Sequence, residues 1–241
     1  KHNHFEIYLM ERRGSLYSAK LVEDACVSLQ TTTNDNERKQ AELFISAFRN
    51  SSKPYSICNH ILTHSSQPAA QFQAVAAVKD ALLREWAMLD FAFVSALRDE
   101  FLLFAVNKHS VLPHFVIHEV LHVVAVIFKR SFFKGGEGNG RQCTDLFVTR
   151  VARLLESGAL SVGLDLARML LEEFDTVSDR ATPLGLPMSY HKRCNSHFQR
   201  GGLLRIFECV LPRLFHLCLN HSHLCLNLSQ LQNSSSSSSS S

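Results

Sequence analysis

The segment NDNERKQAELFISAFR, residues 34–49, shows most directly which kind of fold this chain adopts. Its apolar residues recur at positions i, i+3, i+4 and i+7, the spacing of one face of an α-helix: Ala41, Phe44, Ile45 and Phe48. Asn34 stands before this stripe with Glu37 three positions later, a pattern that resembles a capping box at a helix start. The segment therefore predicts an amphipathic helix that begins at Asn34 and buries one side.

The same period of about 3.6 residues recurs along most of the chain. A short helix is expected after Pro54 and a longer one after Pro68, which suits a first helical turn. The apolar stripe of that longer helix ends at Trp86, which we predict to be a core residue. Further helices are expected over residues 91–108, 113–130, 144–157 (with Gly158 as terminator) and 161–175, and from Leu203 onward. Composition predicts loops at residues 134–141 and 178–202.

Taken two at a time, these helices form a repeating hairpin. The second helices begin near Asn34, Pro68, Pro113 and Ser161, at spacings of 34, 45 and 48 residues. Helix pairs repeated at this period are typical of HEAT and armadillo arrays, in which each pair buries its apolar face against its neighbours. We therefore predict an all-α HEAT-repeat α-solenoid of four to five antiparallel helix pairs in a right-handed superhelical array. An ordinary helical bundle is the alternative that the period alone leaves open.

The composition excludes several classes of protein. A net charge of +3 over 241 residues is too balanced for a protein that coats nucleic acid or an anionic membrane. Seven cysteines without a C-x-x-C pair favour reduced thiols over a secreted disulfide framework. The most apolar window, residues 111–128, contains Pro113, three histidines and Glu119, so it is a poor membrane span. Neither nucleic acid nor a membrane is expected as a partner.

The ends of the chain differ from its middle. Residues 1–19 are expected to be a poorly ordered or foreign leader, and residues 20–217 to hold the helical repeats. Residues 218–241 end in a run of serines and are expected to be a low-complexity, disordered tail.

Part of the repeat region resembles a known family. Residues 37–86 are similar to the importin-β N-terminal domain of the karyopherins, the nuclear transport receptors, through the segments ERKQAELFISAF (37–48), HIL (60–62) and QAVAAVKDALLREW (73–86). Within that family, five segments resemble the N-terminal region of an exportin: FRNSSKPYSICNHIL (48–62), LLREW (82–86), VAVIFKR (124–130), ARLLESG (152–158) and GLPMSYHKRC (185–194).

The resemblance implies a function in binding rather than catalysis. It implies a non-enzymatic receptor without cofactor, whose N-terminal arch binds the GTP-bound form of the small GTPase Ran. The longer receptor would carry protein cargo, translation factor 5A among it, past the proteins of the nuclear pore and shuttle between nucleus and cytoplasm. The second helices would line the concave side and supply charged Ran contacts: Lys79, Asp80, Arg84, Lys129, Arg130, Arg168 and Glu172. Solvated side chains, or an i, i+4 pair such as Arg168 with Glu172, are the simpler interpretation of these charges.

Two other functions stay open at this point. His118, Glu119 and His122 form an H-E-x-x-H motif, in which two histidines one helical turn apart chelate zinc and the glutamate is a general base of a metallopeptidase. Against this, His114, His118 and His122 lie on one stripe of an otherwise apolar helix, which indicates the polar edge of a packed helix, and we expect no bound metal. The remaining alternative is a helical scaffold that does not bind Ran.

Overall fold

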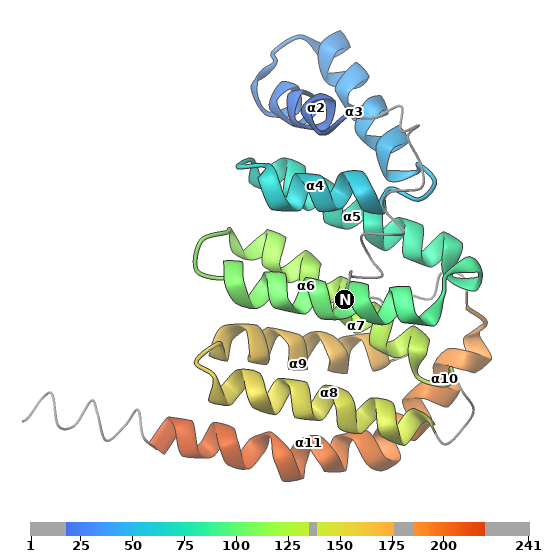
Figure 1. The fold of residues 1–241 in the computed structure, drawn as a ribbon, viewed down its shortest axis with the longest axis vertical. Helices are drawn as coiled ribbons and strands as arrows, with labels where there is room; N and C mark the ends of the chain where they lie inside the picture. The colour runs from blue at the N-terminus through green and yellow to red at the C-terminus, as the bar shows by residue number, and fades with distance from the viewer. Residues whose placement is uncertain (1–17, 135–138, 176–185, 220–241) are drawn as a thin grey trace, which may run out of the picture.

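The chain is a stack of helix pairs. The computed structural model describes residues 18–134, 139–175 and 186–219, and these residues form helices and turns without a strand. The first helices of the pairs are α2 (Ala19–Thr31), α4 (Tyr55–His64), α6 (Phe91–Lys108) and α8 (Asn139–Glu156). The second helices are α3 (Asp35–Arg49), α5 (Pro68–Glu85), α7 (His114–Ser131) and α9 (Leu160–Phe174). Figure 1 shows them stacked from α2 and α3 at one end to α11 at the other.

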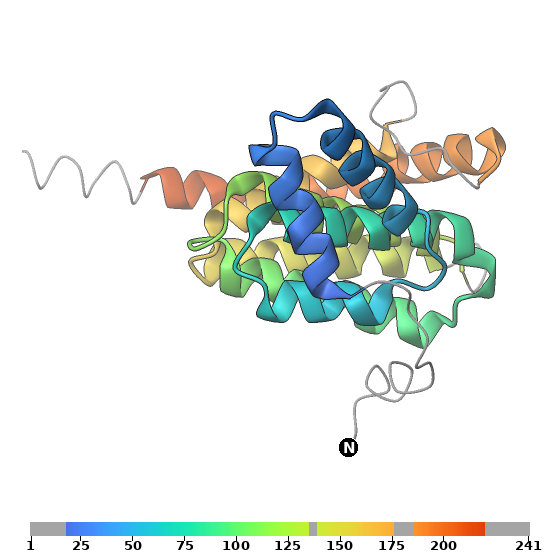
Figure 2. The ribbon, with the colours of Figure 1, turned by 90° about the horizontal axis from the view of Figure 1, so that it is seen from above.

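The stacking confirms the predicted all-α, HEAT-type solenoid. Each first helix packs on its second helix, and the second helices pack on one another in the order α3, α5, α7, α9. Seen along the stack, the helices of successive pairs overlie one another, with α2 and α3 at the near end (Figure 2). The second helices begin at or within one residue of the predicted positions, because a proline or a capping residue marks each of the first three starts.

The start of α3 shows how local polar groups fix a helix boundary. The Asn34 side chain accepts a hydrogen bond of 2.9 Å from the backbone N–H of Asn36, as an N-cap residue does. The Glu37 carboxylate instead accepts from the Thr32 hydroxyl at 2.6 Å and from the Asn34 side-chain amide at 3.5 Å. The predicted cap is therefore present, with the glutamate bound to side chains of the preceding turn.

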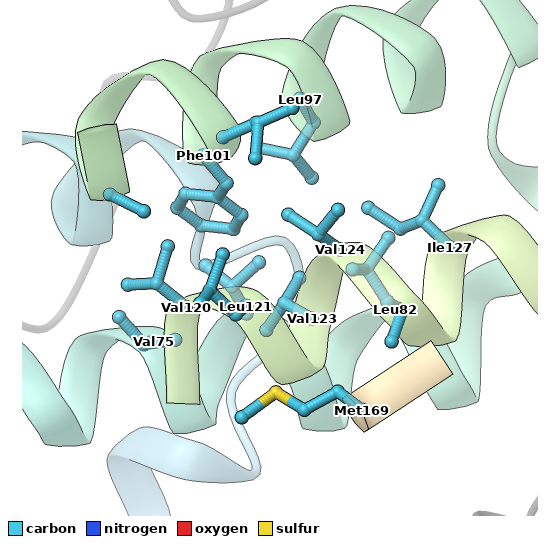
Figure 3. Packing of buried hydrophobic residues seen from close by; sticks show 14 of the residues in the cluster. Val75, Leu82, Leu97, Phe101, Val120, Leu121, Val123, Val124, Ile127 and Met169 are labelled. Atoms are coloured by element: carbon cyan, nitrogen blue, oxygen red, sulfur yellow. The ribbon is translucent and has the colours of Figure 1, made fainter. Parts of the chain in front are cut away.

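Helix α7 lies at the centre of the core. Val120, Leu121, Val123, Val124 and Ile127 are buried along it and face three other helices. Figure 3 shows these side chains between α5 (Val75 and Leu82), α6 (Leu97 and Phe101) and α9 (Met169). An array of this kind is stabilised by apolar area that adjacent pairs remove from water, about 25 cal/mol per Å².

The predicted loop over residues 178–202 is wrong for its second half. Residues 188–197 form α10 (Met188–His197), which continues through a π-helical turn, η2 (Phe198–Gly202), into α11 (Leu203–Cys209). The polar composition of α10 concealed a buried stripe at i, i+3 and i+7: His191, Cys194 and Phe198. The start of α11 at Leu203 agrees with the prediction. Residues 211–219 are helical as well.

Two smaller expectations also change. Helix α8 begins at Asn139, five residues before the predicted start at Thr144, and thus takes in the end of the predicted loop. Trp86 is half-buried at the edge of the core, in the short 3-10 helix η1 (Trp86–Met88), rather than fully buried. Gly158, in contrast, ends α8 as predicted, with a φ of +83° that favours glycine.

The six cysteines in the described residues are free thiols. None of the described helices is both long and apolar enough to cross a membrane. The boundaries predicted at residues 19 and 217 remain predictions, since residues 1–17 and the serine run lie outside the described residues.

Candidate partner-binding site

The second helices carry all seven residues that were predicted to contact Ran. Lys79, Asp80 and Arg84 belong to α5, Lys129 and Arg130 to α7, and Arg168 and Glu172 to α9. Because α5, α7 and α9 pack side by side, these charges lie on adjacent helices of one layer. Their surroundings differ sharply, however, and divide them into buried and exposed groups.

A network of five charged or ionisable side chains connects α5, α7 and α9. The Lys79 ammonium forms an ion pair with Glu119, whose other carboxylate oxygen lies 3.8 Å from His122 Nδ1. On the far side of the ring, His122 Nε2 lies 3.7 Å from Glu173 Oε2. Lys129 Nζ is 3.4 Å from Glu173 Oε1. We call these residues the charge network. It links three successive helix pairs through groups that are largely removed from water.

The electrostatics of the network favour the charged forms of Glu119 and His122, whereas burial lowers the pKa of Lys129. Burial raises the pKa of Glu119, but His122 and Lys79 outweigh burial and bring that pKa to about 2. Burial lowers the pKa of His122, yet the carboxylates of Glu119 and Glu173 reverse this effect and leave the pKa above its ordinary value. His122 therefore lies between two carboxylates that favour its protonated form, one on its own helix and one on the next pair.

This environment gives the H-E-x-x-H motif a structural role. Glu119 is an ion-pair partner of Lys79, and a carboxylate whose pKa is about 2 is a weak general base. Burial and the nearby Arg168 lower the pKa of His118. In the part of the chain that the structure describes, no group of three His, Cys, Asp or Glu side chains is placed to hold a metal ion. The geometry thus gives no support to the metallopeptidase interpretation.

Lys129 and Arg130 hold the end of α7 in place. Their exposed fractions are 1% and 3%, so neither presents its charge to a macromolecule in solution. Lys129 Nζ donates to the backbone carbonyl of Glu173, and the Arg130 guanidinium lies 5.8 Å from the centre of the Trp86 ring. The Tyr190 hydroxyl is 3.0 Å from the carbonyls of both Lys129 and Arg130, which ties α10 to the same point.

The other predicted contacts are nearer to solvent. Asp80 pairs with Arg49 of α3 at 2.8 Å. Arg84 is exposed and donates to the carbonyls of Arg49 and Ser51 at 3.2 and 2.8 Å, where it satisfies the end of α3. These contacts connect the first two pairs and still leave the Arg84 side chain open to solvent.

On α9, Arg168 is exposed and lies within reach of two acids. Its guanidinium is 3.3 Å from Asp165 and 4.0 Å from Glu172, so the predicted i, i+4 pair is present but long. Asp165 also lies 3.1 Å from His114 Nε2 on α7. The surface over α7 and α9 therefore carries charges of both signs.

Sequence reasoning missed several residues that matter here. Glu173 and Tyr190 were not singled out, and Glu119 was considered only as part of a zinc motif. The available signal was the position of Glu119 and Glu173 among apolar residues of their helices, because a carboxylate in an apolar stripe needs a partner. Which partner it finds depends on the neighbouring pair, about 40 to 50 residues away, and the spacing along one helix does not reveal it.

The comparisons with known proteins agree with this architecture. Residues 15–236 match the model of the protein family described as Exportin-4. The chain belongs to the exportin-4 family. It is also similar to Exportin-4 of Dictyostelium discoideum, with 26% identity over 202 residues. That match covers 80% of this chain and 18% of the relative, so this exportin-4 family chain spans about a fifth of the length of the relative it matches.

Proposed function

We propose that this chain forms repeats of a nuclear export receptor and that its second-helix layer takes part in binding GTP-bound Ran. The observation that carries the proposal is the exportin-4 family match over residues 15–236, joined to a solenoid whose second helices lie side by side. Solenoids bind proteins through extended surfaces of this kind rather than through a single deep cavity. In the longer receptor the chain would serve transport without enzymatic activity.

The environment of each charge narrows the set of Ran contacts. Arg84, Arg168 and Glu172 keep accessible side chains on α5 and α9. Lys79 belongs to the charge network, and Lys129 and Arg130 are buried. We therefore assign recognition to Arg84, Arg168 and Glu172, with Asp80 at their edge, and assign a supporting role to the other three.

The remaining parts of the proposal concern the longer receptor. These parts rest on the family rather than on any residue described above. They are the transport of cargo such as translation factor 5A, contacts with nuclear pore proteins, and shuttling between nucleus and cytoplasm. Nucleotide preference follows from the physics of Ran itself, because switch segments are ordered only when the γ-phosphate is present.

The experiment is a binding measurement with Ran loaded with a non-hydrolysable GTP analogue or with GDP. The chain should bind the GTP form in preference to the GDP form. Its affinity should be low, since a partial interface must still offset the full cost of association. Higher salt should slow association, because exposed charges act mainly on the encounter rate.

A double variant, Arg84→Glu with Arg168→Glu, should weaken binding by about tenfold or more, because reversed charges repel a complementary partner. Arg153→Glu is the matched control, since Arg153 is exposed on the first helix α8. Circular dichroism checks that each variant keeps its helicity. Equal capture of the two nucleotide forms, or none at high micromolar Ran, would favour the scaffold interpretation instead.

A further inference from the structure

A pocket of about 510 Å³ opens between the first turns of α8 and the segment that joins α10 to α11. Helix α8 contributes Arg141 and Asp145, the joining segment contributes Arg200 and Gly201, and α11 contributes Arg205. None of the five residues of the charge network lines this pocket. Neither the Ran proposal nor the family match assigns it a role.

The pocket is lined by three arginines against one carboxylate. Arg205 is compensated, because its Nε lies 2.9 Å from Asp145 and its Nη1 lies 3.4 Å from Glu208. Arg141 and Arg200 are exposed, and within the described ranges neither guanidinium has a hydrogen-bond or ion-pair partner. Two arginines that line one small concavity, without a partner among the described residues, create a positive potential that attracts an anionic group.

The backbone around the pocket is shaped by glycines. An added Cβ at Gly202 would lie 2.4 Å from Cδ2 of Phe198, a buried ring stacked on Phe174, so only glycine fits there. A Cβ at Gly201 would meet no atom within 4 Å, which means that the chain leaves open space at the pocket wall. The π-helical turn η2 contains both glycines. Such turns are rare in proteins overall, and those that occur are often found at functional sites.

We propose that this pocket binds one anionic oxygen group, a phosphorylated or acidic side chain, on a segment of a protein partner. Arg141 and Arg200 would donate to its oxygens from the two elements that form the pocket, since the planar guanidinium matches phosphate and carboxylate geometry. The volume suits a single side chain with its neighbours. A nucleic acid would instead require a longer positive groove that follows a sugar-phosphate backbone.

The test uses the complete 241-residue chain and three fluorescent peptides that differ only at the central residue, which is phosphoserine, glutamate or serine. Fluorescence anisotropy should show binding at least about tenfold tighter for phosphoserine than for serine, because charge-assisted hydrogen bonds are about twice as strong as neutral ones. Glutamate should fall between the two. Inorganic phosphate should compete only at much higher concentration than the unlabelled phosphopeptide.

Arg141→Ala and Arg200→Ala should each weaken phosphopeptide binding by about tenfold, since each removes a charged donor. Both side chains are exposed and unpaired in the described structure, so neither variant should lower the unfolding midpoint. Gly201→Leu should weaken binding by filling the open space at the wall. Arg153→Ala, on the same helix and outside the pocket, should leave binding unchanged.

Three outcomes would overturn the proposal. One is equal affinity for the phosphoserine and serine peptides. A second is competition by inorganic phosphate at the same concentration as the phosphopeptide, which would identify the free ion as the ligand. A third is tighter binding of a single-stranded oligonucleotide that depends on the same two arginines. None of these outcomes bears on Ran, which the separate experiment above addresses.

Discussion

His122 Nε2 of α7 lies 3.7 Å from Glu173 Oε2 of α9, while Nδ1 of the same ring faces Glu119. One imidazole thus connects two helix pairs, and it does so best when it is protonated, because both neighbours are carboxylates. Lys79 and Lys129 also pair with these acids, Lys79 with Glu119 and Lys129 with Glu173. The contact between these two helix pairs is therefore expected to be stronger when His122 is protonated.

The first prediction concerns pH. The pKa of His122 is raised in the folded chain, so its stabilising contribution is complete below its unfolded pKa of about 6.5 and is lost as pH rises through the folded value. The pKa of His118 is lowered, so its contribution has the opposite sign. The measurement is the urea midpoint as a function of pH between about pH 5.5 and 8.5. Relative to the parent chain, this midpoint should fall less with rising pH in His122→Gln and should fall more, or rise less, in His118→Gln.

Identical slopes in these two variants and in the parent chain would show that neither imidazole titrates differently on folding. Asn59→Gln on α4 provides the control, because it neither adds nor removes a titratable group.

The second prediction concerns Lys79. Lys79→Ala leaves the buried Glu119 carboxylate with a weaker set of partners, and we expect a loss of about 2–3 kcal/mol in the free energy of unfolding at neutral pH. The double variant Lys79→Met with Glu119→Leu should recover most of this loss, because removing both charges also removes the cost of burying them. Urea unfolding followed by circular dichroism measures each value.

Lys20→Ala is the matched control for Lys79→Ala. Lys20 pairs with Asp24 one turn away, at 78% and 56% exposure, and such a pair contributes less than about 1 kcal/mol. Equal losses in the two lysine variants would contradict a special role for the network.

The third prediction concerns Trp86. A fully buried tryptophan would cost about 3–5 kcal/mol on truncation to alanine, but this ring is half-buried and its face is approached by Arg130 and by Lys134. We expect Trp86→Ala to cost about 2–3 kcal/mol. Met88→Ala, two residues away at 72% exposure, should be nearly neutral. A Trp86→Ala variant as stable as the parent would place the ring outside the core.

The fourth prediction concerns the glycine that ends α8. Gly158→Ala should lower the free energy of unfolding by about 1 kcal/mol or more, because alanine at a φ of +83° is strained although nothing obstructs its side chain. Gly201→Ala meets open space at an ordinary φ and should be neutral or slightly stabilising. A neutral Gly158→Ala would mean that the turn relaxes to another conformation.

The sequence predicted the repeat architecture well because the determinants of these helices are local. Asn34 and Pro68 mark helix starts by capping and by a preset φ, and Gly158 marks an end. Helix α10 was not predicted, because the features that place it are not local. Its buried stripe includes His191, a polar residue that only the packing of α9 and α10 places inside.

The sequence predicted the surroundings of these charges less well, because a charge alone does not reveal its burial. Lys129 and Arg168 look equivalent in sequence, since each is a cation near an apolar stripe. The structure buries the first against Glu173 and leaves the second at the surface. Lys129 also lies where α10 contacts the end of α7, through the hydrogen bond from the Tyr190 hydroxyl to the Lys129 carbonyl.

The charge network also predicts where the solenoid bends. It joins the second, third and fourth pairs through largely buried ion pairs. The ion pair between the first and second pairs is nearer to solvent, since the side chains of Arg49 and Asp80 are 37% and 26% exposed, and it lies beside the Arg84 hydrogen bonds and the packing of α3 on α5. A pair that is partly exposed is replaced by water at less cost than a buried one. When a partner binds, we expect the contact between α3 and α5 to adjust more readily than the contacts among α5, α7 and α9.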